Sequence, residues 1–150
     1  MITREERARE LFSKGYNCAQ SVFGVFCDDA ELSFHTALKL SSGFGGGLRC
    51  GEVCGAVSGA VMAIGLKCGF HVEKDFDQKS YCNKKTSECM EKFKQENGSV
   101  LCRDLLGADI RFPDDLNNPD LRELFTTVCP RMVASAVRIV ESMDFKSAEK

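Results

Sequence analysis

Cysteine is the residue type in this chain whose number and placement suggest chemistry. The sequence has nine cysteines among 150 residues. A thiolate is both a nucleophile and a soft metal ligand, so cysteines gathered in one place can support redox chemistry or hold a metal. Four of them fall at or near an expected helix start or a proline break: Cys18, Cys54, Cys102 and Cys129. Free N–H groups and the helix dipole favour thiolates at such positions. We therefore expect these four to form one site, as catalytic thiols or as metal ligands.

The stretch from residue 43 to 69, GFGGGLRCGEVCGAVSGAVMAIGLKCG, is the most constrained part of the chain. Its first glycines leave the backbone free to take positive φ angles. A short apolar helix then follows, in which Gly55, Gly59 and Ala63 recur every fourth residue. This spacing leaves one helix face almost without side chains, so we expect another helix to pack closely against it.

Cys54 lies in the expected first turn of that helix, close to the positive charge of Arg49. The dipole and this charge predict that Cys54 is the most readily ionised thiol of a metal-free site. Cys50 lies one turn earlier and is the expected resolving thiol or alternative ligand. We therefore include Cys50 among the candidate catalytic residues.

Helix signals run along the whole chain, without convincing β alternation. The expected helix caps are Thr3, Asn17, Ser33, Ser99 and Asn118, and a charged helix is expected over 73–95. A loop is expected over 108–118, and a long apolar helix after it. Pro130 interrupts that helix, so Cys129 should lie at a kink or begin a restarted helix. The sequence predicts an all-α fold, with residues 1–150 forming one compact bundle of about six helices and a glycine-rich loop before the central helix.

The motif CGAVSG at residues 54–59 resembles the C_GCAxxG_C_C family, whose members are described as redox-active. The first family cysteine matches Cys18 in NCAQ, the third Cys102 in CRDLLG, and the fourth Cys129. The resemblance implies redox activity at these four positions. Five cysteines lie outside the pattern, and Cys82 and Cys89 among them share one side of the expected 73–95 helix, as an accessory thiol pair or as packing residues. Apart from Cys50, the roles of the additional cysteines are open: Cys27, Cys68, Cys82 and Cys89.

Charge and hydropathy exclude several classes of function. With a net charge of −2, the chain lacks the excess of positive charge that binding to nucleic acid or to an anionic membrane requires. The longest apolar run, residues 53–66, is shorter than the roughly 20 residues that span a bilayer. The charged N-terminus lacks the apolar run of a secretory signal. We expect a cytoplasmic protein, in which reduced cysteines favour thiol or metal chemistry over a disulfide framework.

Three kinds of function remain open at this stage. The first is a redox-active or metal-binding protein that uses the four cysteines for thiol/disulfide chemistry, for a bound metal or for an iron–sulfur centre. The second is a non-catalytic metal carrier, and the third is a structural or interaction protein whose scattered cysteines pack the core. Zinc and an iron–sulfur cluster suit four thiolates equally well, and no CxxC spacing separates them. The sequence identifies neither the redox partner or metal donor nor the oligomeric state, and it leaves open whether the protein is an enzyme.

Overall fold

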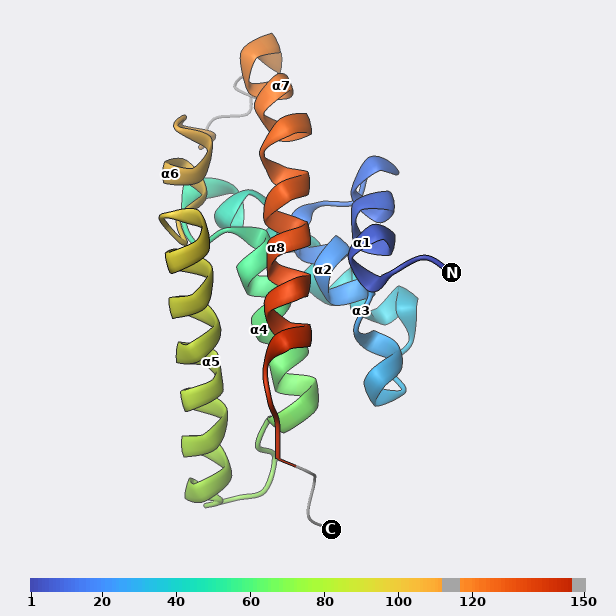
Figure 1. The fold of residues 1–150 in the computed structure, drawn as a ribbon, viewed down its shortest axis with the longest axis vertical. Coiled ribbons are helices and arrows are strands. Elements are labelled where there is room, and N and C mark those ends of the chain that lie inside the picture. Colours follow the sequence, from blue (N-terminus) through green and yellow to red (C-terminus); the bar gives the residue numbers. More distant parts are fainter. Residues whose placement is uncertain (112–116, 147–150) are drawn as a thin grey trace.

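The computed structural model describes residues 1–111 and 117–146, and within these ranges it confirms the expected all-α class (Figure 1). Phe112, Pro113 and Leu116 of the expected 108–118 loop lie outside the described residues. The helices are α1 (Arg4–Ser13), α2 (Cys18–Gly24), α3 (Phe34–Ser41), α4 (Gly55–Cys68), α5 (Phe76–Asn97), α6 (Cys102–Leu106), α7 (Pro119–Thr127) and α8 (Cys129–Ser142), with short helical turns η1 (Cys27–Ala30), η2 (Ser42–Phe44) and η3 (Gly47–Gly51).

Most of the expected helix starts are confirmed by their capping hydrogen bonds. Thr3 and Asn17 each form a capping box, in which the side chain accepts from the backbone N–H three residues later. Asn118 caps α7, which begins with Pro119. The expected cap at Ser99 is wrong, because α6 begins at Cys102 after Leu101. The Ser99 hydroxyl instead accepts from the Leu101 N–H at 3.0 Å.

The expected last helix is divided into α7 and α8, which meet at Val128 (Figure 1). Pro130 is the second residue of α8, where a missing N–H costs no hydrogen bond within the helix. Cys129 therefore begins a new helix, as its position before the proline predicted.

Helix α4 lies at the centre of the fold and packs against α2, α5 and α8. In Figure 1, α5 and α8 run beside α4, and α1 to α3 cover its other side. Its side chains Ala56, Val57, Ala60 and Ile64 are fully buried. This position explains why α4 is apolar nearly all round.

Gly55 and Gly59 form the face of α4 that meets α2, which confirms their expected packing role. A Cβ added at Gly59 would lie 2.7 Å from the Ala19 carbonyl oxygen. One added at Gly55 would lie 3.2 Å from the Cβ atom of Cys18. The same close approach therefore brings Cys18 next to the start of α4.

None of the helices within residues 1–111 and 117–146 combines the length and the apolar character needed to cross a bilayer.

Replacing Gly59 with Leu should lower the melting temperature, because the new side chain would overlap the backbone of α2. Overpacking of this kind costs about 1–3 kcal/mol or more. Gly65→Ala on the same helix is the matched control, since a Cβ there has no heavy atom within 4 Å. Thermal unfolding followed by circular dichroism would measure both changes. A melting temperature for Gly59→Leu as high as that of Gly65→Ala would show that the two helices do not pack as described.

Candidate functional site

Cys18, Cys54, Cys102 and Cys129 line one cavity of about 310 Å³. This volume is within the range of pockets that bind small molecules. The apolar part of its wall consists largely of side chains from α1, α6, α7 and α8, among them Phe12, Leu105, Phe125 and Met132. The four cysteines are therefore brought together, in contrast to the scattered arrangement expected of cysteines that only pack the core.

Each of the four cysteines lies at the start of a helix. Cys18, Cys102 and Cys129 are the first residues of α2, α6 and α8, and Cys54 is the N-cap of α4. Cys54 thus precedes the first turn in which it was expected. The cavity lies where these helix starts meet, so free N–H groups and positive dipole ends point toward the sulfurs from several directions.

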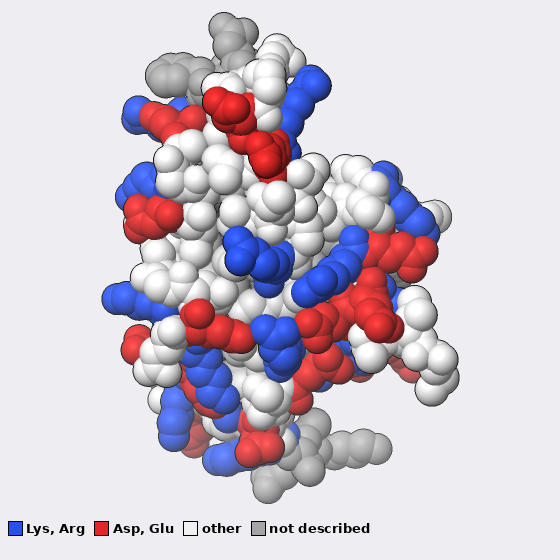
Figure 2. All heavy atoms as spheres, turned by 45° about the horizontal axis from the view of Figure 1, so that its top comes forward, with Lys and Arg blue, Asp and Glu red and all other residues white. Residues whose placement is uncertain are grey.

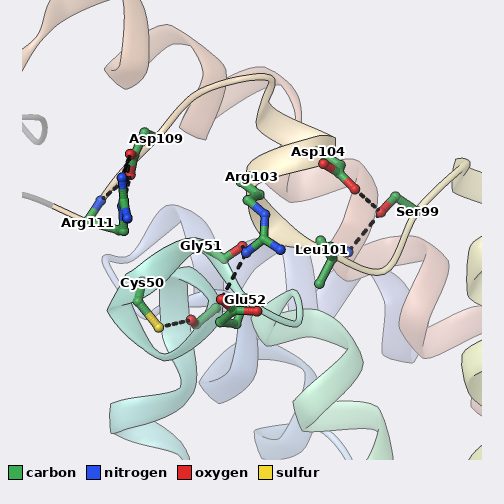
Figure 3. Close-up of polar contacts among 10 residues, drawn as sticks. Cys50, Gly51, Glu52, Ser99, Leu101, Arg103, Asp104, Asp109 and Arg111 are labelled. Atoms are coloured by element: carbon green, nitrogen blue, oxygen red, sulfur yellow. Dashed lines mark hydrogen bonds and ion pairs between the residues drawn. The ribbon is translucent and has the colours of Figure 1, made fainter.

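Cys54 and Cys102 are linked through the backbone residues beside them. Val53 and Leu101 form an isolated antiparallel bridge. The Cys54 N–H donates to the Val100 carbonyl oxygen at 2.7 Å, and the Cys102 N–H donates to the Glu52 carbonyl oxygen, also at 2.7 Å. Across the same junction the Arg103 guanidinium contacts the Glu52 carboxylate at 2.9 Å (Figure 3). The starts of α4 and α6 are therefore held side by side.

A left-handed turn leads into this bridge. Gly46, Gly47, Leu48 and Arg49 all have positive φ, between 59° and 64°. Such angles cost a residue with a side chain about 1–2 kcal/mol. At Gly47 a Cβ would lie 2.4 Å from the Glu52 nitrogen, so only glycine fits there. The turn directs Arg49 to the wall of the cavity. In the sequence, the glycines are the only signal for this turn.

The four thiols interact electrostatically in every pairwise combination. A hydrogen bond from the Cys18 thiol lowers the pKa of Cys129. The same hydrogen bond, followed by burial, raises the pKa of Cys18 well above its ordinary value. Cys129 is therefore the member of this pair that ionises first.

Burial raises the pKa of Cys54 to about 11, although the N–H groups of Ala56 and Val57 beside its sulfur act in the opposite direction. The expectation that Cys54 ionises most readily is therefore wrong, because loss of hydration outweighs the helix start. Burial, together with the charges of the neighbouring thiols, raises the pKa of Cys102 to about 12, and Arg49 only partly opposes this.

Cys50 is not brought to the cavity. Its half-buried thiol donates to the Gly47 carbonyl oxygen at 3.3 Å (Figure 3). It lines a separate surface hollow with Glu52 and Arg103. This placement gives no support to Cys50 as the partner of Cys54. The four other additional cysteines also lie away from the cavity wall: Cys27, Cys68, Cys82 and Cys89.

Within residues 1–111 and 117–146, no group of three or more His, Cys, Asp or Glu side chains is placed closely enough to hold a metal ion. Zinc bonds to sulfur are ~2.3 Å long, so the four sulfurs would have to move inward to share one ion. The predicted metal ligation by these cysteines stays a prediction.

Comparison with protein families gives one match along most of the chain. The family model C_GCAxxG_C_C, described as "Putative redox-active protein", matches residues 16–143, a range that includes all four cavity cysteines. Comparison with curated proteins and with solved structures gives no match.

Among the four cavity thiols, Cys129 should react fastest with iodoacetamide at pH 7, because its pKa is lowered while those of the others are raised. Cys18→Ala removes the hydrogen bond and should slow this reaction about tenfold, because a hydrogen bond to a charged group contributes about 1.5 kcal/mol or more. Cys18→Ser keeps a donor and should slow it less. Mass spectrometry of the labelled peptides over a range of pH would measure each rate. An unchanged pH profile in Cys18→Ala would contradict the hydrogen bond.

Proposed function

Because the chain belongs to the C_GCAxxG_C_C family of redox-active proteins, we propose that it is a thiol redox protein whose reactive pair is Cys18 and Cys129. The observation that carries this proposal is that Cys18 and Cys129 line one cavity large enough for a small molecule, in which the Cys18 thiol lowers the pKa of Cys129. A nucleophilic thiolate beside a second thiol is the arrangement that thiol–disulfide exchange requires.

The reaction proceeds in two exchange steps. The Cys129 thiolate attacks one sulfur of a small disulfide, which forms a mixed disulfide and releases the first product thiolate. Cys18 then loses its proton and attacks the Cys129 sulfur, which releases the second product thiolate and leaves a Cys18–Cys129 disulfide. Two protein thiols are oxidised, and one substrate disulfide is reduced to two thiols. Exchange with a reducing dithiol restores the starting state.

Cys54 and Cys102 follow as a second pair. The charge of the Cys129 thiolate contributes to the raised pKa values of both residues. Once Cys129 is in a disulfide that charge is gone, so both thiols become easier to ionise. Oxidation of the first pair therefore favours exchange with the second.

The cavity wall indicates the kind of substrate. Its lining is largely apolar, and Arg49 is the charged side chain among the residues that line it. Arg49 is exposed, as expected of a residue at the mouth of the cavity. These features favour a small disulfide that carries a carboxylate, which the guanidinium can bind.

A second candidate is a centre in which Cys18, Cys54, Cys102 and Cys129 hold zinc or an iron–sulfur cluster. The mutual interaction of all four thiols favours it. An iron–sulfur cluster would supply one-electron chemistry, and zinc would serve a structural or carrier role. Either group would require the four sulfurs to move inward. For this reason the metal centre is the second candidate.

Treatment of the reduced, anaerobically purified protein with oxidised glutathione should give a Cys18–Cys129 disulfide and two molecules of reduced glutathione for each bond formed. Non-reducing peptide mapping and a thiol assay would measure the two. Cys129→Ser should abolish the bond, and Cys50→Ser, which alters a thiol outside the cavity, should leave it unchanged.

Metal and sulfide analysis of the same preparation tests the second candidate. Stoichiometric zinc, or iron with sulfide, together with failure to form the Cys18–Cys129 bond, would replace the thiol mechanism by the metal centre. Metal-free protein in which oxidised glutathione forms no such bond would contradict both.

A further inference from the structure

A second group of nucleophilic side chains lies at the opposite end of α4 from the cavity. We infer that Cys68 and Cys82 form an additional redox-active dithiol, which a disulfide oxidant converts into a covalent link between α4 and α5. The inference rests on a different part of the fold from the reaction proposed for Cys18 and Cys129, and it does not depend on that reaction.

Cys68 and Cys82 lie in the same side-chain cluster between α4 and α5, and the Cys82 thiol contributes to the raised pKa of Cys68. Cys68 is the last residue of α4 and is 6% exposed, and its thiol also lies 3.3 Å from the Ile64 carbonyl oxygen. Cys82 lies in the second turn of α5 and is half-buried. One member of the pair is therefore accessible to a reagent in solution, and the other is held beneath it.

Contacts of the polypeptide hold this pair in place without help from the sulfurs. The Gln78 side-chain amide donates to the Cys68 carbonyl oxygen at 2.7 Å. The Gln78 backbone N–H donates to Asp75, the N-cap of α5. Gln78 and Cys82 lie one turn apart on one face of α5, so the contact of Gln78 with Cys68 also places Cys82 beside Cys68.

The roles of the two thiols follow from exposure and charge. Burial raises the pKa of Cys68 to about 11, with a further contribution from Cys82, whereas Lys85 acts in the opposite direction. Because Cys82 is the more exposed of the two, we assign it as the attacking thiol and Cys68 as the resolving thiol. Lys85 is one turn from Cys82 on α5, and its own side chain is only 13% exposed.

This pair differs from the one that sequence spacing suggested. Cys89 is 1% exposed and lies two turns further along α5, whereas the contact of Cys82 is with Cys68 of the preceding helix. The helix α4 separates the pair from Cys54 by about 21 Å, since each residue adds ~1.5 Å. Direct exchange of a disulfide with the cavity is therefore excluded by distance.

The oxidation balances with an external disulfide. The Cys82 thiolate attacks the oxidant and releases one thiolate, and Cys68 then loses its proton, attacks the Cys82 sulfur and releases the second. The product bond closes a loop of about 15 residues, which restricts the unfolded chain. Oxidation should therefore raise the melting temperature, as expected of a link between two packed helices.

The test uses the full chain, equilibrated in glutathione buffers from reducing to oxidising. Non-reducing peptide mapping should find a Cys68–Cys82 disulfide. The oxidised protein should melt about 5–10 °C higher than the oxidised Cys82→Ser variant. Cys89→Ser, the matched control on the same helix, should keep both the bond and the higher melting temperature. Cys68→Ser should behave like Cys82→Ser.

Three results would overturn the inference: a Cys82–Cys89 bond, Cys82 carrying glutathione while Cys68 stays free, or equal melting temperatures for oxidised wild type and oxidised Cys82→Ser. Because Cys82 is half-buried, its serine variant keeps the test informative even if Cys68→Ser does not fold. Peptides that contain Cys18 and Cys129 are read separately in the same map, so a failure of one pair is distinguished from a failure of the other.

Discussion

The approach of α4 to α2 at Gly55 and Gly59 is the constraint on which the cavity depends. No side chain larger than hydrogen fits at Gly59, where a Cβ would lie 2.7 Å from a carbonyl oxygen of α2. This contact places Cys18 beside the start of α4, the Val53–Leu101 bridge adds Cys102, and α8 packs against both helices and supplies Cys129. Four helix starts that are far apart in the sequence therefore line one cavity.

Gathering four thiols in one buried space limits how many of them can be charged. Helix starts favour thiolates, but burial and mutual repulsion favour thiols, and for Cys54 and Cys102 the second pair of effects is stronger. Only Cys129 has its pKa lowered, because Cys18 donates a hydrogen bond to it. Cys129 is therefore the first of the four thiols to lose its proton, an order suited to stepwise exchange.

Elsewhere on the surface, Lys/Arg and Asp/Glu side chains are intermixed over the face shown in Figure 2, in keeping with the small net charge.

Local signals in the sequence predicted more of this structure than its long-range contacts. Capping residues, the glycine spacing of α4 and Pro130 predicted the all-α class, the close helix approach and the new helix at Cys129, because each acts within a few residues. The left-handed turn at Leu48 and Arg49 could not be predicted, since these residue types disfavour it and tertiary contacts impose it. The ionisation order was missed for a related reason, because burial and the hydrogen bond from Cys18 depend on segments far apart in the chain. The pairing of Cys82 with Cys68 likewise depends on how α5 packs on α4.

The central claim is that the fold itself brings Cys18 and Cys129 into reach of each other. Its most direct test is the effective concentration of this pair, measured from the equilibrium between the protein and glutathione buffers, in native protein and in urea. The account predicts a value at least about a hundredfold higher in native protein, because the two cysteines are far apart along the chain and meet only rarely once it is unfolded. Equal values in the two states would contradict it.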